Sequence, residues 1–179
     1  MYHAARGFSI IELMAGLALA AVLMTQALPS FSGLRERAQV RSTVQELVAT
    51  FNRARTEAVM RHHQATVCPL PEDRALRCAE DSTWEHGWMI YFDYDRNDER
   101  SETEPVVSVF DAIDGLNLQL RSTEGRPRVR FLPNGLASGS NATLRLCMPE
   151  KPDLGRAVVV NNAGRVRSET APQHCAVSA

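Results

Sequence analysis

The chain has 179 residues, of which 44% are hydrophobic, and its formal net charge at pH 7 is only −1. This length and composition are typical of one globular domain with an appendage. The charges are segregated: residues 1–71 carry a net +3, residues 72–114 a net −9 and residues 115–167 a net +6. Such segregation favours a partner surface of one sign, although strands and loops that separate charge without a function give the same pattern.

An apolar segment lies near the N-terminus, in the stretch RGFSIIELMAGLALAAVLMTQALPSF from Arg6 to Phe31. From Phe8 to Gln26 it is apolar or small, except for the carboxylate of Glu12. About twenty such residues are enough to cross a bilayer as a helix, and Arg6 predicts that the short N-terminal side is cytoplasmic. A charge inside such a segment costs roughly 2.5–3.5 kcal/mol, so we expect Glu12 to have a partner.

The helical pattern continues beyond Pro29. Apolar residues recur there at spacings of three and four, at Val40, Val44, Leu47, Phe51, Ala54 and Ala58. This spacing predicts an amphipathic helix whose apolar stripe packs on other elements. A continuous helix from Phe8 to about Arg61 would run roughly 80 Å at 1.5 Å per residue.

After residue 64 the sequence changes to short apolar runs separated by turn signals. The candidate strands are residues 65–68, 87–92, 105–110, 116–120, 128–132, 142–147 and 156–160. The turn signals include PNG at 133–135 and NNAG at 161–164. A long helix followed by such strands predicts an α+β fold, with an antiparallel sheet packed on the helix.

Four cysteines lie downstream of the apolar segment: Cys68, Cys78, Cys147 and Cys175. They form no CxxC pair, which argues against zinc. An even number in an exported domain favours two disulfides. Sequence allows three pairings, of which we favour Cys68–Cys78 and Cys147–Cys175 because each closes a local loop; free buried thiols are the alternative.

The N-terminal residues GFSIIEL, 7–13, resemble the class III signal of type IV pilins and type II secretion pseudopilins. The resemblance implies that a prepilin peptidase cleaves between Gly7 and Phe8 and that Phe8 is then methylated. Pro29 lies where pilins often have a helix-kinking proline. The resemblance also implies that Glu12 pairs with the N-terminal amine of a neighbouring subunit, and each charge then removes the desolvation penalty of the other.

The remainder is similar to the FimT/GspH-like minor pilins, on the segments LVATFNRARTEAVMRHHQATVCP (47–69) and WEHGWMIYFDYDRNDERSETEPVV (84–107). The resemblance implies a type IV pilin-like fold with a leader peptide at 1–7, a transmembrane and filament-core helix half at 8–34, and a periplasmic head at 35–179. It also implies a single-pass subunit of the bacterial inner membrane that later joins other pilin subunits in a pilus.

The sequence RAVVV-NNAG-RVR predicts a β-hairpin in which Gly164 takes a positive φ. Arg165 and Arg167 are two residues apart, so we expect them on one face of the second strand, where guanidinium groups can bind phosphate oxygens. From spacing alone, a solvated strand face is the better interpretation. However, GRVR resembles the GRxR motif of DNA-binding FimT-type pilins, which implies that Gly164, Arg165 and Arg167 form a DNA site for natural transformation.

Further arginines extend this expectation. Arg126, Arg128 and Arg130 alternate along one predicted strand and are candidates for additional DNA contacts. Binding through phosphates would be independent of sequence and sensitive to salt. No aromatic residue alternates with these arginines, so we expect duplex DNA rather than a platform for stacked single-stranded bases.

The acidic stretch DYDRNDERSETE fits the calcium loop of an EF-hand in part. Its template positions 1, 3, 5, 7, 9 and 12 are Asp93, Asp95, Asn97, Glu99, Ser101 and Glu104. Position 6 is Asp98 instead of Gly, and strands instead of helices flank the stretch. We therefore favour a solvated hairpin loop, and expect no metal site and no cofactor.

No set of nucleophile, base and orienting residue is recognisable, and no phosphate-binding glycine loop or H-E-x-x-H motif occurs, so we do not expect an enzyme. The alternative to a DNA-binding pilin is a structural minor pilin or type II secretion pseudopilin that primes or caps a filament.

Overall fold

The computed structural model describes residues 9–113, 117–171, 173 and 175, with the backbone alone over 24–32. The chain divides into two units, residues 1–39 and 40–179. One helix, α1 (Ile10–Arg61), belongs to both units, as the sequence predicts. The predicted cleavage site, Gly7 and Phe8, lies outside the described residues.

In the first unit, the described large apolar side chains of α1 are exposed. They are Ile10, Ile11, Leu13, Met14, Leu17, Leu19, Val22, Leu23 and Leu34. Glu12 is exposed beside them, in the first turn. The sequence predicts a membrane span here; among the described residues, however, no helix combines the length and the apolar character needed to cross a bilayer.

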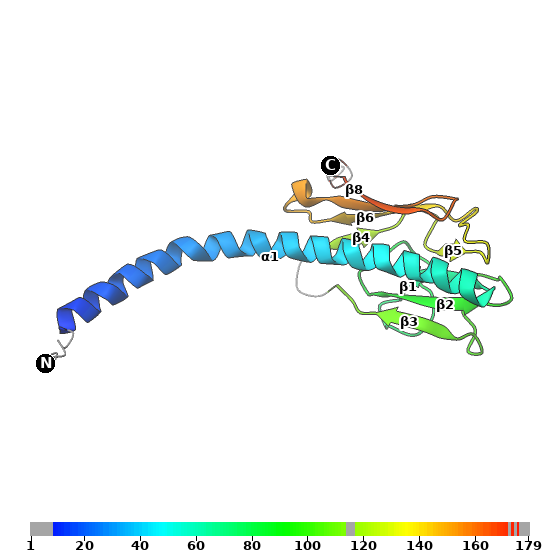
Figure 1. Cartoon of the computed structure of the whole chain (residues 1–179), viewed down its shortest axis with the longest axis horizontal. Helices are drawn as coiled ribbons and strands as arrows, with labels where there is room; N and C mark the ends of the chain where they lie inside the picture. Colours follow the sequence, from blue (N-terminus) through cyan, green and yellow to red (C-terminus); the bar gives the residue numbers. More distant parts are fainter. Residues whose placement is uncertain (1–8, 114–116, 172, 174, 176–179) are drawn as a thin grey trace, which may run out of the picture. The chain divides into compact units, whose positions relative to one another are not determined.

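In the second unit, the predicted apolar stripe of α1 is confirmed, because all six of its residues from Val40 to Ala58 are buried. Figure 1 shows this half of the helix running along the strands. The helix ends at Arg61, and His62 follows in the left-handed conformation with a φ of 57°. That conformation commonly ends helices, so the chain turns here into the first strand.

The strands form two antiparallel four-stranded sheets, which confirms the predicted fold class. Sheet A has the order β3-β2-β1-β5, with β1 at Gln64–Pro69, β2 at Trp88–Asp93, β3 at Val106–Phe110 and β5 at Val129–Phe131. Sheet B has the order β4-β6-β7-β8, with β4 at Gln119–Arg121, β6 at Ala142–Cys147, β7 at Arg156–Val160 and β8 at Val166–Thr170. A short 3₁₀ helix, η1 (Pro152–Leu154), lies between β6 and β7.

One core joins the helix to both sheets. It includes Leu47 and Phe51 of α1, Ile90 of β2 and Leu144 of β6, all fully buried. The second face of sheet A is also covered, because Cys68, Met89 and Tyr91 pack there with Leu70 and Cys78 from the segment after β1. The outer face of sheet B is more open, because alternate residues of β6 are only partly buried and most residues of β8 are exposed.

Both favoured disulfides are present. Cys68–Cys78 ties the segment after β1 back to that strand. Cys147–Cys175 ties the C-terminal segment to the end of β6. Among the described residues no cysteine is free, so the alternative of buried thiols is not supported.

Candidate functional site

The predicted hairpin between β7 and β8 is present, and a tight turn closes it. The N–H of Gly164 donates to the carbonyl of Asn161 at 2.8 Å, and the N–H of Asn161 donates to the carbonyl of Arg165 at 3.1 Å. The Asn161 side chain adds a bond, because its Oδ1 accepts from the N–H of Arg165 at 3.0 Å. Gly164 has a φ of 71°, as the sequence predicts. This geometry is typical of a three-residue hairpin loop with glycine at its left-handed position.

Gly164 packs against a second turn and against α1. A Cβ on Gly164 would lie 2.1 Å from the carbonyl oxygen of Gly135, in the PNG turn. The Gly164 carbonyl accepts a hydrogen bond from Nη1 of Arg55 at 3.2 Å. The carbonyl of Asn162 accepts from the N–H of Ala137 at 2.9 Å. Gly164 is buried with both backbone groups bonded, so it shapes and anchors the turn; the structure leaves it no free group for a ligand.

The two arginines of the motif are both exposed, but they differ in position and in partners. Arg167 lies in β8, an edge strand of sheet B, opposite Val159. Its Nε is 3.4 Å from Oε2 of Glu169, two residues along the same strand. Arg165 lies just before β8, at the end of the turn. Its guanidinium has no hydrogen-bond or ion-pair partner among the residues that the structure describes.

The three arginines expected along one strand are placed differently from the prediction. Only Arg130 lies in β5, because this strand is limited to Val129–Phe131. All three nevertheless line one small pocket of about 150 Å³, together with Asp98 and Ser140. Arg126 lies in a turn before the strand, which its N–H closes onto the carbonyl of Thr123 at 2.9 Å.

Two of these three side chains are already engaged. Arg130 forms an ion pair with Asp98, with 3.0 Å between Nη1 and Oδ2. Arg126 is exposed and donates to the carbonyl of Asn141 at 2.9 Å and also to its side chain. The Nε of Arg128 is buried and has no hydrogen-bond partner among the described residues. Of the three arginines, Arg126 is the exposed one, so it is the best placed for a further ligand contact in spite of its bonds to Asn141.

Register places Arg126 near the turn of the motif. Asn141, which holds Arg126, directly precedes β6, and the first β6 residue, Ala142, pairs with Val160 of β7. Val160 in turn pairs with Val166 of β8. Arg126 and Arg165 are consequently anchored at the same end of sheet B.

The outer face of sheet B carries two more arginines that the sequence could not place. Arg121 pairs with Arg145, Arg145 with Ala157, and Ala157 with Glu169. Residues directly opposite on neighbouring antiparallel strands share a face, so these arginines share the face of Glu169. Arg167, two residues before Glu169, lies on that face as well. Arg121 is partly neutralised, because its Nε lies 3.4 Å from Oε1 of Glu85.

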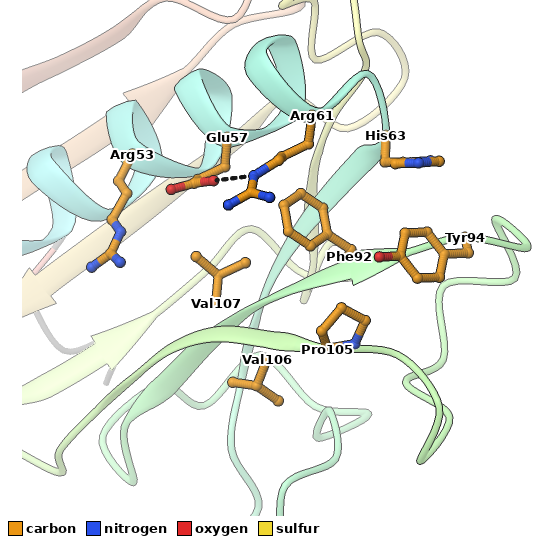
Figure 2. A pocket seen from close by; sticks show the side chains of 9 residues that line it. All are labelled: Arg53, Glu57, Arg61, His63, Phe92, Tyr94, Pro105, Val106 and Val107. Atoms are coloured by element: carbon orange, nitrogen blue, oxygen red, sulfur yellow. Dashed lines mark ion pairs between the residues drawn. The ribbon is translucent and has the colours of Figure 1, made fainter.

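A separate groove of about 590 Å³ lies between the end of α1 and strands β2 and β3 (Figure 2). Its lining residues are Arg53, Glu57, Arg61, His63, Phe92, Tyr94, Pro105, Val106 and Val107. Arg53, Glu57 and Arg61 are four residues apart and share one helix face, whereas Arg55 lies on another face and reaches Gly164. The pairing of Arg61 with Glu57, at 3.7 Å, lowers the net charge of the groove.

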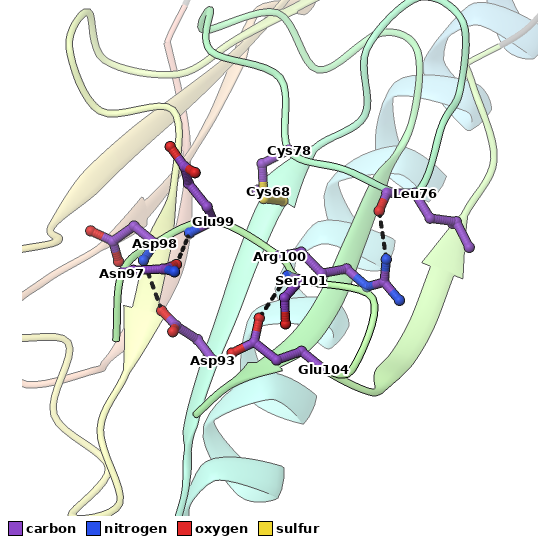
Figure 3. The surroundings of a disulfide bond; sticks show 10 residues. All are labelled: Cys68, Leu76, Cys78, Asp93, Asn97, Asp98, Glu99, Arg100, Ser101 and Glu104. Atoms are coloured by element: carbon purple, nitrogen blue, oxygen red, sulfur yellow. Dashed lines mark hydrogen bonds between the residues drawn. A yellow bond between two sulfur atoms is a disulfide. The ribbon is translucent and has the colours of Figure 1, made fainter. Parts of the chain in front are cut away.

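The acidic segment between β2 and β3 is a mostly exposed connection between two antiparallel strands, as the sequence predicts, except at its two ends. Its two ends, Asp93 and Glu104, are 1% and 3% exposed. Figure 3 shows the segment beside the Cys68–Cys78 disulfide, with the N–H of Asp98 bonded to Asp93 and the N–H of Ser101 bonded to Glu104. Burial raises the pKa of Asp93; the backbone N–H groups of Asp98 and Arg96 oppose this shift, and the charges of Glu104 and Asp98 add to it.

Comparisons with known proteins agree with this architecture. A family model described as type II transport protein GspH matches residues 43–164. A model of the prokaryotic N-terminal methylation motif matches residues 2–25, which include Gly7, Phe8 and Glu12. Arg165 and Arg167 lie just beyond the end of the GspH match. No curated protein matches the sequence.

Two solved structures share the fold. The crystal structure of the type IV minor pilin FimU of Pseudomonas aeruginosa, strain PAO1, has a TM-score of 0.59 and 22% identity, over 77% of this chain and 92% of that one. The minor pseudopilin EpsH from the type 2 secretion system of Vibrio cholerae has a TM-score of 0.51 and 12% identity, over 74% of this chain and 97% of that one. Because the GspH model covers more than half of the sequence, the chain belongs to the family of the type II transport protein GspH.

Proposed function

We propose that this chain is a minor type IV pilin whose head binds duplex DNA without sequence preference, as a step in DNA uptake for natural transformation. The observation that carries the proposal is the exposed pair Arg165 and Arg167, on an edge strand and its turn. The guanidinium of Arg165 lacks a partner among the described residues. The backbone beneath the pair is fixed by Gly164, Gly135 and Arg55.

Phosphate binding follows from the chemistry of this surface. Guanidinium groups form charge-assisted, bidentate hydrogen bonds to phosphate oxygens. The ion pair of Arg167 with Glu169 is exposed on both sides, and exposed pairs contribute only about 0–1 kcal/mol, so a phosphate can replace the carboxylate. Arg126, near the same end of sheet B, is the best-placed further contact. Gly164 acts through the shape of the turn.

The direct test is DNA binding by the full-length protein in detergent micelles, followed by fluorescence anisotropy of a labelled duplex over a range of salt concentrations. We expect Arg165→Gln combined with Arg167→Gln to weaken binding at least tenfold at low salt. Each lost phosphate contact should also reduce the slope of log K against log salt by about 0.9. The matched control, Arg41→Gln with Arg53→Gln, removes two exposed helical arginines and should bind nearly as the wild type does. Equal losses in the two double variants would contradict the site.

The N-terminal residues support a proposal about processing and assembly. We infer that residues 1–7 are a leader removed by prepilin peptidase, and that 8–34 anchor the subunit in the inner membrane and later enter the filament core. The head, 35–179, would then be periplasmic. The exposed apolar side chains around Glu12 suit burial against other subunits, and Glu12 would pair with the amine of a neighbouring Phe8. Mass spectrometry of the mature chain should find it starting at a methylated Phe8, and Glu12→Ala should block incorporation into filaments.

A structural role without DNA binding is the second candidate. The GspH match ends at Gly164, before the two arginines, and EpsH, a minor pseudopilin, shares the fold. In this role the subunit primes or caps a filament, and the Arg165 and Arg167 variants assemble normally. Absence of salt-dependent DNA binding by the wild type, together with normal assembly, would favour this second function.

A further inference from the structure

Three carboxylates converge where the connection between β2 and β3 begins and ends. Asp93 is the last residue of β2, Asp95 follows two residues later, and Glu104 lies just before β3. One oxygen from each of these side chains lies within 4.8 Å of the other two. Residues eleven positions apart in sequence are thus brought to one point at the base of the loop.

Two of these carboxylates are removed from water. Asp93 is 1% exposed and Glu104 is 3% exposed. Both oxygens of Glu104 accept backbone N–H groups, Oε1 from Tyr94 at 2.6 Å and Oε2 from Ser101 at 2.9 Å. Glu104 is therefore fixed in place from both sides.

The two oxygens of Asp93 differ. Oδ2 accepts from Nε2 of Gln64 at 2.7 Å and from the N–H of Asp98 at 3.2 Å. Oδ1 is buried and has no hydrogen-bond partner among the described residues. A buried acceptor without a donor costs roughly 1–3 kcal/mol, and more when it is charged. Such an oxygen inside a carboxylate cluster points to a missing positive ligand.

No described arginine neutralises the three carboxylates. Two basic side chains at this loop have other partners: Arg130 pairs with Asp98, and Nη1 of Arg100 donates to the carbonyl of Leu76 at 2.9 Å. Like charges held this close, partly out of water, repel each other strongly. The cluster lacks a counter-charge of its own within the part of the chain that the structure describes.

We propose that Asp93, Asp95 and Glu104 bind one Ca²⁺ ion. Ca²⁺ takes six to eight oxygen ligands at about 2.3–2.6 Å, so oxygens on opposite sides of the ion are about 5 Å apart. The limit of 4.8 Å between the three carboxylate oxygens is compatible with one such coordination sphere. The remaining ligands would be water and loop carbonyls. The oxygen-only ligand set is typical of a hard cation, whereas zinc prefers nitrogen and sulfur ligands.

The loop has the shape that this proposal requires. Asp93, Asp95 and Glu104 hold positions 1, 3 and 12 of the EF-hand template, the first and last of which must meet around the ion. Asp98 holds position 6, where the template has glycine for a sharp turn, and its φ is 66°. Aspartate tolerates this left-handed conformation better than most residues, so the missing glycine does not prevent the turn.

The test uses the full-length protein in detergent, stripped with EDTA, and isothermal titration calorimetry with CaCl₂ or MgCl₂. We expect one Ca²⁺ per chain, with a dissociation constant of roughly 10⁻⁵ to 10⁻³ M. Asp95→Asn, at an exposed position, and Glu104→Gln should each weaken binding at least tenfold. Glu99→Gln removes the same charge from an exposed residue of the same loop and should leave binding unchanged.

A wild-type measurement keeps the proposal testable if the buried variant fails to fold. Tb³⁺ replaces Ca²⁺ at oxygen sites, and we expect Tyr94, whose N–H bonds Glu104, to sensitise its emission. We expect Tyr-sensitised emission that Ca²⁺ displaces and that Asp95→Asn weakens. Absence of Ca²⁺ binding at millimolar concentration, an equal loss in Glu99→Gln, or Mg²⁺ binding as tight as Ca²⁺ binding would each overturn the proposal.

Discussion

Two connections between antiparallel strands carry opposite charge and bury it differently. The β2–β3 connection of sheet A begins and ends with the buried carboxylates of Asp93 and Glu104. The β7–β8 turn of sheet B buries its backbone at Gly164 and exposes the guanidinium groups of Arg165 and Arg167. Inward-facing charge needs a small counter-ion that can enter the fold, whereas outward-facing charge suits a large polyanion. The sign of the side chains decides between a cation and an anion, and their burial or exposure decides how large that ligand can be.

The backbone also differs between the two connections. The β7–β8 turn, residues 161–165, is called the arginine turn below. Its Gly164 contacts Gly135 of a distant turn and Arg55 of α1, so the arginine turn packs against other parts of the head. The acidic connection is held mainly by hydrogen bonds of its own residues, such as those of Tyr94 and Ser101 with Glu104. We therefore expect the arginine turn to be sensitive to changes of backbone and the acidic connection to be sensitive to changes of charge.

The largest effect is expected for Gly164→Ala. The new Cβ would lie 2.1 Å from the carbonyl oxygen of Gly135, and the residue would have to keep a positive φ. We expect a loss of about 3 kcal/mol in the free energy of unfolding, measured by urea denaturation of the full chain. Gly125→Ala is the matched control, because Gly125 has a φ of 69° with no atom within 4 Å of the built Cβ. Gly125→Ala should lower the free energy of unfolding by only about 1 kcal/mol. Equal losses in the two variants would show that the contact between the two turns does not contribute to stability.

A smaller effect of opposite sign is expected for Asp93→Asn in metal-free protein. The amide keeps an oxygen for Gln64 and for the N–H of Asp98, and it removes one of three repelling charges. Without metal we expect the free energy of unfolding to rise by about 1 kcal/mol. With Ca²⁺ the wild type should become more stable than Asp93→Asn, because only the wild type gains binding energy. Thermal melts in EDTA and in CaCl₂ measure the two differences in stability. The control Glu99→Gln should change the stability little in either condition. If Asp93→Asn stayed more stable than the wild type in CaCl₂, the metal site would be contradicted.

Most of the fold can be predicted from short-range patterns in the sequence. The spacing of apolar residues from Val40 to Ala58 predicts the buried face of α1, because a helix of period 3.6 repeats its own pattern. The strands and the β7–β8 hairpin are likewise predicted by local patterns, namely short apolar runs separated by turn residues. Both disulfides close local loops, Cys68–Cys78 over ten residues and Cys147–Cys175 over twenty-eight, so proximity along the chain was a sufficient guide.

The candidate sites were predicted less completely, because they depend on contacts between distant segments. Nothing near residue 55 indicates that Arg55 would meet Gly164, 109 positions away. The expected row of Arg126, Arg128 and Arg130 assumed a longer strand than β5. The EF-hand spacing indicates the acidic cluster, whereas Asp98 at the glycine position and the flanking strands favour a solvated loop. Most of the loop is exposed, but its ends, Asp93 and Glu104, are buried. Burial of Asp93 depends on Gln64 and on the packing of sheet A, which the local sequence does not reveal.

The smallest effect, and the sharpest test of the arginine turn, is expected for Glu169→Gln. This change removes the carboxylate that lies 3.4 Å from Nε of Arg167 and leaves the side chain nearly the same size. Because an exposed pair contributes about 0–1 kcal/mol, DNA affinity should rise about two- to fivefold. Anisotropy titrations at several salt concentrations measure the change. Glu150→Gln removes an exposed acid elsewhere and supplies the control for net charge. If both variants bind DNA equally more tightly, general attraction explains the gain; a gain confined to Glu169→Gln places a phosphate at Arg167.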